Sequence, residues 1–233
     1  MLGDLWSFQG RYRTLHLTWI AFFLTFVVWF NLAPLATTVK ADLGLTVGQI
    51  RTVAICNVAL TIPARVLIGM LLDKFGPRIT YSSILVFSAI PCLLFASAQD
   101  FNQLVVARLL LSIVGAGFVI GIRMVAEWFP PKEIGLAEGI YGGWGNFGSA
   151  FSALTMVALA GFLSFSGGFE LPTGAVLNWR GAIALTGIVS AVYGLFYFFN
   201  VTDTPPGKTY QRPAKTAGLE VTSMRDFWGL LGM

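Results

Sequence analysis

The chain has 233 residues, of which 56% are hydrophobic and only 11% are charged, and its formal net charge is +4. A typical soluble domain has about a quarter charged residues, whereas this chain has a mean hydropathy of +0.75 and apolar runs of bilayer-spanning length, about 20 residues each, along nearly all of it. This composition excludes a soluble globular domain and predicts an all-α integral membrane protein. The basic residues are scattered through short connections, so nucleic-acid binding is not expected.

The apolar runs predict six transmembrane helices, at about 17–39, 50–72, 79–98, 103–126, 135–163 and 181–200. We expect the bundle 17–200 to follow a cytoplasmic N-terminus, 1–16, and to precede a flexible cytoplasmic linker, 201–233, which contains several prolines and lysines. The first apolar run is too long for the core of a cleavable signal peptide. Three prolines lie within the spans: Pro34, Pro63 and Pro91. Each leaves a backbone carbonyl without its helical hydrogen-bond donor, and neighbouring helices can supply a donor instead.

The basic residues predict the orientation of the bundle. If the N-terminus is cytoplasmic, the inner side carries nine of them: Arg11, Arg13, Lys74, Arg78, Lys132, Lys208, Arg212, Lys215 and Arg225. The outer side then carries three: Lys40, Arg51 and Arg180. This asymmetry satisfies the positive-inside rule. We therefore expect a multi-pass protein of the plasma (inner) membrane, surrounded by its lipid, with both ends of the chain in the cytoplasm.

Arg65 is the most informative charge inside a predicted span. An ionised residue near mid-bilayer costs at least ~2.5–3.5 kcal/mol and marks a functional site by default. Asn57, Thr61 and Arg65 are spaced by four residues, which places them on one helix face, and no acidic residue lies in the middle of any span to neutralise the arginine. A guanidinium facing a cavity suits a small planar oxyanion. The alternative is an arginine that reaches the headgroups or pairs with backbone carbonyls.

Two further arginines fall within the fourth predicted span. Arg108 lies about one to two turns inside the outer end, where it could reach outward, brace neighbouring helices or contact substrate. Arg123 lies near the inner end of the same span. We expect Arg123 to anchor the helix at the interface or to pair with Glu127 or Glu138 in a cytoplasmic gate.

Glycine is concentrated in the fifth predicted span. Gly135, Gly139 and Gly143 form two consecutive GxxxG steps, a pattern that lets helix backbones approach closely. Asn146 lies among the glycines, and its amide needs a polar partner in apolar surroundings. We interpret Asn146 and the adjacent glycine backbone as a second contact for an anion, with close helix packing alone as the alternative.

Residues for metal, redox or acid–base chemistry are sparse. Cys56 and Cys92 lie in apolar runs and match no metal or redox spacing, and His16 is the only histidine. No predicted span contains a nucleophile next to a base. We therefore expect no metal, no cofactor and no enzyme activity.

The connection between the second and third spans reads Gly69-Met-Leu-Leu-Asp73-Lys74-Phe-Gly76-Pro-Arg78. It resembles the G-x-x-x-D-R/K-x-G-x-R/K signature of the major facilitator superfamily. The resemblance implies a fold of two helical halves, of which this chain would be the N-terminal six-helix half, and a role for this connection in the conformational lock between the halves. The residues themselves agree, because Asp73 can cap a neighbouring helix end and Lys74 and Arg78 can hold the connection inside.

The run from Gly142 to Gly148 resembles the nitrate signature, G-x-G-N-x-G, of the nitrate/nitrite porter family within that superfamily, and the run Glu127-Trp-Phe-Pro-Pro131 fits the same family. The resemblance implies transport of nitrate or nitrite by alternating access, with protons as a candidate coupling ion. The residues that it places at the anion are Arg65, Asn146, Gly142, Gly143, Gly145 and Phe118.

The sequence also departs from the family pattern. Some relatives carry Asn where Tyr141 stands, and the spacing from Arg108 to Gly115 is looser than the usual superfamily pattern. The family has a second half with its own binding arginine, so we expect this chain to be a truncated product that transports little without that half. Two alternatives stay open: a superfamily transporter for another substrate, such as an exporter of organic compounds, and a non-transporting membrane scaffold.

Overall fold

The computed structural model describes residues 7–210 of the chain. Within them, six helical stretches are long and apolar enough to cross a membrane: Gly10–Asp42, Val47–Phe75, Pro77–Ser97, Phe101–Trp128, Ile134–Ser166 and Trp179–Asn200. Each corresponds to one predicted span, so the prediction of six transmembrane helices is confirmed.

Most of these spans consist of more than one helical segment. The first span contains α1 (Gly10–Phe30), the 3-10 helix η2 (Ala33–Leu35) and α2 (Ala36–Asp42). The second contains α3 (Val47–Ala59) and α4 (Thr61–Phe75), and the third α5 (Pro77–Phe87) and α6 (Ala89–Ser97). The fourth contains α7 (Phe101–Ser112), the 3-10 helix η3 (Ile113–Ala116) and α8 (Gly117–Trp128). The fifth contains α9 (Ile134–Phe162) and η4 (Leu163–Ser166), and the sixth is α10 (Trp179–Asn200).

The breaks in the first three spans have a common cause. Pro34 lies in η2, and Pro63 and Pro91 are each the third residue after a break. Proline has no N–H to donate to the carbonyl four residues earlier, and its ring clashes with that carbonyl. Near the break in the second span, a side chain of the first span supplies a donor: the Trp29 indole N–H donates to the Asn57 carbonyl at 2.7 Å.

The fourth span breaks without a proline. Its 3-10 segment contains Gly115, where an added Cβ would lie 2.7 Å from the Trp29 ring. Thr61 on the second span donates its hydroxyl proton to the carbonyl of Ser112 at 3.2 Å, just before this segment. The interrupted middles of the first, second and fourth spans therefore meet one another inside the bundle.

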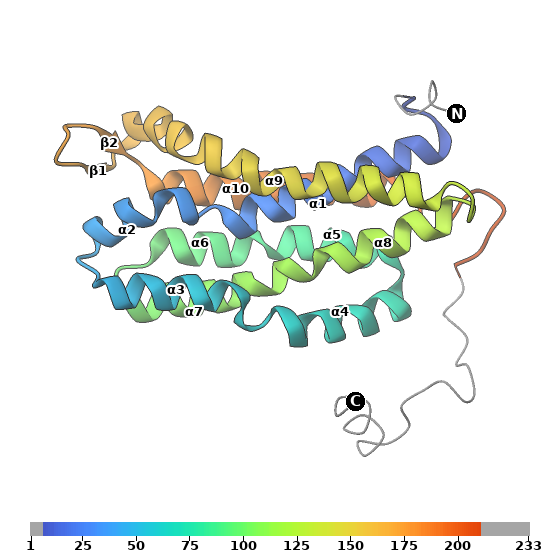
Figure 1. Ribbon diagram of the computed structural model, residues 1–233, viewed down its shortest axis with the longest axis horizontal. Helices are drawn as coiled ribbons and strands as arrows, with labels where there is room; N and C mark the ends of the chain where they lie inside the picture. The colour runs from blue at the N-terminus through green and yellow to red at the C-terminus, as the bar shows by residue number, and fades with distance from the viewer. Residues whose placement is uncertain (1–6, 211–233) are drawn as a thin grey trace, which may run out of the picture.

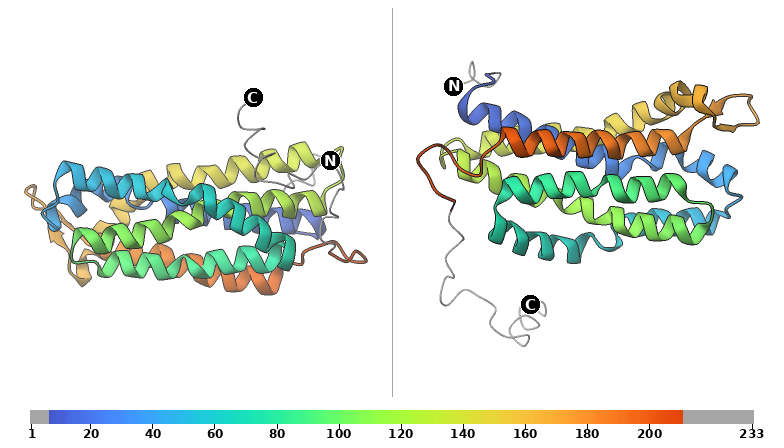
Figure 2. Two further views of the ribbon diagram at one scale, coloured as in Figure 1. Left: turned by 90° about the horizontal axis from the view of Figure 1, so that it is seen from below. Right: turned by 180° about the vertical axis from the view of Figure 1, so that it is seen from behind.

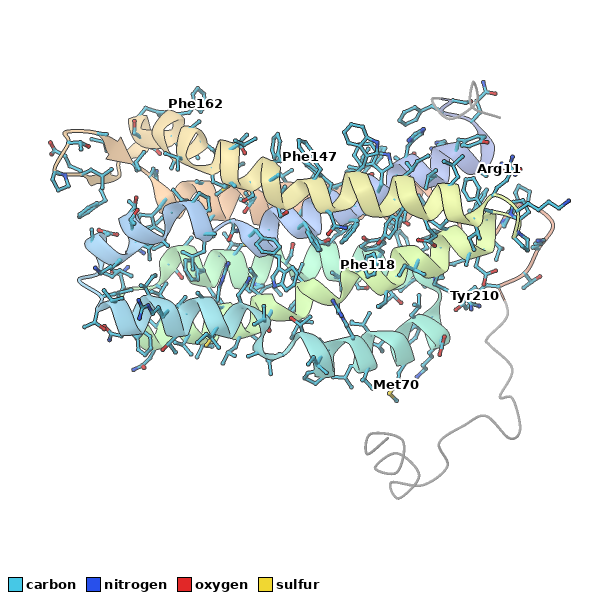
Figure 3. All side chains as sticks on the ribbon, viewed as in Figure 1. Arg11, Met70, Phe118, Phe147, Phe162 and Tyr210 are labelled. Carbon is cyan, nitrogen blue, oxygen red and sulfur yellow. The ribbon has the colours of Figure 1, made fainter. Side chains whose placement is uncertain are left out.

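The six spans run along the long axis of the bundle (Figure 1). Helix α1 packs against α9 and α10, α10 packs against α5 and α6, and α3 packs against α7. Figure 2 shows from two further sides that the connections alternate between the two ends. One end carries Arg11 and Tyr210, labelled in Figure 3, and is called the Arg11 end below. The opposite end carries a two-stranded hairpin and is called the hairpin end.

The hairpin is a feature that the sequence did not predict. Strand β1 (Phe169–Glu170) pairs antiparallel with β2 (Val176–Leu177). Two-residue strands are too short to give an alternating pattern, so the segment between the last two predicted spans reads only as a loop. The turn is formed by Gly174 at φ +80°, and the Asn178 N–H donates to the Ala160 carbonyl at 2.9 Å, which ties the hairpin to α9.

The ends of the bundle also differ from the predicted boundaries. Helix α1 begins at Gly10 and not near Leu17. Its first turns are held by Tyr12, which is buried and whose ring centre lies 5.7 Å from that of Phe129. At the other end of the chain, the predicted linker 201–233 is described only to Tyr210. The predicted cytoplasmic charges Arg212, Lys215 and Arg225 lie outside the described residues.

Candidate anion site

Arg65 is the fifth residue of α4 and lies beside the face with which this helix packs on the bundle. That buried face contains Thr61, Ala64, Ile68 and Leu72, whereas Arg65 is exposed. Within residues 7–210, its guanidinium makes no ion pair and no hydrogen bond. Its five N–H donors are therefore not used by the described part of the chain.

The polar face predicted for the second span is divided in the structure. Asn57 and Thr61 are buried while Arg65 is exposed. The predicted single face assumed one straight helix, but the break at Leu60 separates Asn57 on α3 from Arg65 on α4. Asn57 and Thr61 therefore serve helix packing, and only Arg65 remains oriented away from the packed core.

Phe118 belongs to an aromatic cluster of three rings, contributed by α1, α8 and α9. Its ring stacks on that of Tyr141 with an interplanar angle of 14° and a distance of 6.0 Å between ring centres. The centre of the Phe22 ring lies 5.3 Å from that of Phe118. The Tyr141 hydroxyl donates to the Phe118 carbonyl at 2.9 Å, which fixes α9 against α8. Figure 3 places Phe118 between the ribbons of α9 and α4, well away from both ends of the bundle. Since α4 packs against η3 and α8, the helices of Arg65 and Phe118 are neighbours.

The glycines of α9 fall into two groups. Gly145 and Gly148 face α1, where an added Cβ would collide with the Phe22 ring and with the Phe23 carbonyl, respectively. Gly135, Gly139, Gly142 and Gly143 have open space where a Cβ would stand. The expectation that the GxxxG steps bring two helices together is therefore not met within residues 7–210. Close packing of α1 on α9 depends on Gly145 and Gly148 instead.

Asn146 is exposed on α9 and finds its polar partner within its own helix. Its side-chain N–H donates to the Gly142 carbonyl at 2.7 Å, one turn earlier. This bond places the amide over the open glycine backbone of α9. The three glycines predicted at the anion thus differ: Gly142 and Gly143 accompany Asn146, whereas Gly145 supports the Phe22 ring of the aromatic cluster.

The deeply buried arginine of this bundle is Arg108. Arg108 is only 2% exposed. Its guanidinium donates hydrogen bonds to the Asn31 side-chain oxygen and to the Trp29 carbonyl, each at 3.0 Å. Its guanidinium also lies 5.5 Å from the centre of the Phe95 ring. Of the roles considered for Arg108, bracing of neighbouring helices is correct and reaching outward to headgroups is wrong.

Asn31 is a residue whose role the sequence reasoning missed. It is buried at the break between α1 and η2, where it accepts from Arg108 and donates its amide proton to Thr186 at 3.0 Å. The signal was a polar residue inside the first apolar run, three positions before Pro34. Asn31 therefore links the first, fourth and sixth spans.

Arg123 pairs with Glu127 on the same helix at 2.7 Å. Of the two partners predicted, Glu127 is thus the one in contact. Glu138 on α9 is half-buried, and its Oε1 is shielded from solvent without a hydrogen-bond partner in the described part of the chain.

The connection from Gly69 to Arg78 makes a tight turn between α4 and α5. Gly76 adopts φ +84°, and an added Cβ would lie 2.7 Å from the carboxylate of Asp203. Asp203 accepts a hydrogen bond from the backbone N–H of Arg78 at 2.7 Å, in the first turn of α5. Burial raises the pKa of Asp203, and the N–H and the positive charge of Arg78 oppose this shift. Asp203 thus caps α5, the role that we considered for Asp73, which lies exposed on the last turn of α4.

The other two charges of the connection contact aromatic rings. The Lys74 ammonium lies 5.0 Å from the centre of the Phe75 ring, and the Arg78 guanidinium lies 4.8 Å from that of Phe198 at the end of α10. A sequence model described as the Major Facilitator Superfamily matches residues 18–232 of the chain. The chain belongs to the major facilitator superfamily. The match includes the connection from Gly69 to Arg78.

Relatives within the superfamily agree with this assignment. The chain is 62% identical to the nitrate/nitrite transporter NrtP of Picosynechococcus sp., over 100% of the chain and 46% of that protein. It is 59% identical to the nitrate/nitrite transporter NrtP of Nostoc punctiforme, over 99% of the chain and 45% of that protein. The chain thus spans about half the length of these curated relatives. The predicted family resemblance is confirmed.

Among solved structures, the fold is similar to a bacterial homologue of the human lysosomal transporter Spinster in its inward-facing, unoccupied conformation. The TM-score is 0.69 at 20% sequence identity, over 95% of this chain and 49% of the other. The prediction of an all-α six-helix half of a superfamily fold is confirmed. Because its superfamily relatives are transporters, the prediction that the chain is not an enzyme is confirmed as well.

Proposed function

We propose that this chain forms half of a secondary active transporter that moves nitrate, nitrite or both across the plasma membrane. The observation that carries the proposal is the exposed guanidinium of Arg65, which has no acidic partner among residues 7–210 and lies on a helix that neighbours the aromatic cluster. The names of the two NrtP relatives support the choice of anion.

The proposed site combines charge, shape and a polar amide. Nitrate and nitrite are small planar anions, and a guanidinium can donate two parallel hydrogen bonds to two of their oxygens. The Phe118 ring offers a flat apolar surface that favours a planar partner. Asn146, with Gly142 and Gly143 beside it, supplies amide and backbone contacts, and Gly145 keeps Phe22 in the aromatic cluster.

Transport in this proposal occurs by alternating access between two helical halves with the anion at their interface. Gly69, Asp73, Lys74, Gly76 and Arg78 form the connection that locks the halves in one conformation. A second half supplies the remaining contacts to the anion, and Gly135, Gly139, Gly142 and Gly143 of α9 have open space where a Cβ would stand. The bundle is multi-pass in the membrane, and the Arg11 end faces the cytoplasm.

The orientation rests on the distribution of basic residues over the two ends. The connections and termini at the Arg11 end carry Arg11, Arg13, Lys74, Arg78, Lys132 and Lys208. Those at the hairpin end carry Lys40, Arg51 and Arg180. An excess of positive charge marks the cytoplasmic side of a membrane protein.

Uptake of labelled nitrate and nitrite tests the proposal, in cells that lack their own nitrate transport and express this protein from its complete gene. Arg65→Ala removes up to two charge-assisted hydrogen bonds, so we expect uptake at low substrate concentration to fall by about tenfold or more. Arg51→Ala is the matched control, since Arg51 is also an exposed arginine of the second span but lies near the hairpin end. Uptake by Arg65→Ala at the affinity of the unchanged protein would refute the proposal.

A further inference from the structure

Glu138 stands out among the carboxylates because part of it is buried without a partner. It lies on α9, four residues after the first residue of that helix, near the Arg11 end. Its Oε1 is shielded from solvent and accepts no hydrogen bond from residues 7–210. A shielded carboxylate oxygen without a donor is unfavourable when the group is ionised. A bound proton removes the charge that causes this cost.

The positively charged groups at the Arg11 end of the helices that pack against α9 are engaged elsewhere. On α8, Arg123 pairs with Glu127 at 2.7 Å. On α1, Arg11 pairs with Glu133 at 2.9 Å, and Arg13 donates to the Asn200 side chain at 2.8 Å. The other titratable groups on the helices that pack against α9, and on α9 itself, are Tyr12, His16, Tyr141, Tyr193, Tyr197 and Arg180. Arg180 lies at the hairpin end, where it pairs with Asp42 at 3.4 Å.

No side chain in residues 7–210 makes an ion pair or hydrogen bond with Glu138, so none of these groups neutralises it. The Nε of Arg123 is likewise buried without an acceptor, which leaves opposite unsatisfied groups on two packed helices. A small relative movement of α8 and α9 would change the surroundings of both.

Glu138 is connected to the candidate anion site through Tyr141. The two residues are three positions apart on α9 and so lie on the same side of the helix. Tyr141 stacks on Phe118 and Phe22 in the aromatic cluster. An added Cβ at Gly121 would collide with the Tyr141 ring, so α8 and α9 touch directly at this level. Movement of α9 at the aromatic cluster therefore also moves the Glu138 carboxylate.

We propose that Glu138 is a proton-binding site whose occupancy is coupled to the anion site. The carboxylate takes one proton from a hydronium ion at the Arg11 end, which yields the neutral acid and water, and returns it when the surroundings of its shielded oxygen open. A transport cycle with one such proton per anion carries no net charge through this group. This inference rests on the proposed function for the identity of the anion, but the proton site itself does not depend on that identity.

Two measurements on the protein expressed from its complete gene test the proposal. The first is the rate of labelled nitrate uptake across a pH series, where a required proton makes the rate fall by up to about tenfold for each pH unit on the alkaline side. Glu138→Gln keeps the shape of the side chain but cannot exchange the proton, so we expect this pH dependence to become flat. Glu138→Asp should restore part of it. Glu133→Gln is the matched control, because Glu133 precedes the same helix but is paired with Arg11.

The second measurement is infrared difference spectroscopy of the purified protein between acid and neutral pH. A protonated carboxyl band that Glu138→Gln removes and Glu133→Gln retains supports the proposal, whatever anion is transported. If that band persists in Glu138→Gln, or if this variant transports nitrate with an unaltered pH profile, the proton site is refuted. If the unchanged protein takes up neither nitrate nor nitrite while the band behaves as expected, the proposed substrate is wrong and the proton site stands.

Discussion

The carboxylate of Asp203 accepts a hydrogen bond of 2.7 Å from the backbone N–H of Arg78, a residue 125 positions earlier in the chain. The first N–H groups of a helix have no partner within the helix, and a negative charge there is favoured by the helix dipole. Gly76, at the position before α5, has no side chain with which to cap it. The cap therefore comes from the segment after the sixth span, which ties the end of the bundle to the connection from Gly69 to Arg78.

Other contacts of the same segment strengthen this connection. The Trp128 indole N–H donates to the Thr202 carbonyl at 3.2 Å, and the Tyr210 hydroxyl donates to the Leu72 carbonyl at 3.0 Å. Residues 201–210 thus join the ends of α4, α5 and α8. Three predictions follow from the contacts of Asp203 and of the buried Arg108.

Replacement of Gly76 by alanine should destabilise the bundle at the Arg11 end. Gly76 has φ +84°, which alanine rarely adopts, and a Cβ there would press against the Asp203 carboxylate. We expect the free energy of unfolding to fall by about 1–3 kcal/mol, measured by denaturant titration of the purified protein in detergent. Gly69→Ala is the control, since Gly69 lies in the interior of α4 with open space at its Cβ position and should be neutral or slightly stabilising. Equal losses for the two variants would contradict this assignment.

The ionisation of Asp203 should make stability depend on pH. Burial raises the pKa of this carboxyl above its value in the unfolded chain, although Arg78 opposes the shift. The folded state then binds the proton more tightly, so the contribution of Asp203 to stability is largest below its unfolded pKa and decreases as the pH rises through its folded pKa. Asp203→Asn keeps an acceptor for the Arg78 N–H but cannot ionise. The stability of this variant should therefore not show the decrease with rising pH that Asp203 causes.

Melting temperatures of the purified protein, measured from about pH 3.5 to pH 7, check the pH dependence. Asp100→Asn is a suitable control, because Asp100 also accepts from a backbone N–H at a helix start, that of Gln103 at 3.0 Å, but lies at the hairpin end. This control should retain the decrease due to Asp203. Parallel curves for the unchanged protein and Asp203→Asn would show that the carboxyl does not titrate differently in the folded state.

Replacement of Arg108 by methionine should be strongly destabilising. The substitution leaves the buried Asn31 oxygen and the Trp29 carbonyl without their donor, and we expect a loss of about 2–5 kcal/mol in the free energy of unfolding. Arg51→Met, at an exposed position of α3, should change it by less than about 0.5 kcal/mol. The double variant Arg108→Met with Asn31→Leu should lose less than the sum of the single losses, by about 0.5–3 kcal/mol. Strict additivity would show that the two side chains do not act as a pair.

Composition and local pattern were sufficient to predict the six spans, the alternation of their connections and the superfamily. Apolar runs of bilayer length identify spans without knowledge of their neighbours, and the run from Gly69 to Arg78 is contiguous in sequence. The spans were predicted as single helices, although the breaks near Pro34, Pro63 and Pro91 have a local cause, the missing N–H of proline.

The tertiary structure alone decided which polar residues are buried and what they contact. Arg65 and Arg108 are both arginines within apolar runs, yet only Arg108 enters the core, because the break at Leu60 turns Arg65 away from the packed face and Asn31 meets Arg108 from another span. Likewise, the spacing of the glycines on α9 does not reveal which of them a neighbouring helix covers. Sequence periodicity gives the faces of one helix, but burial and hydrogen bonding depend on side chains that distant parts of the chain bring to those faces.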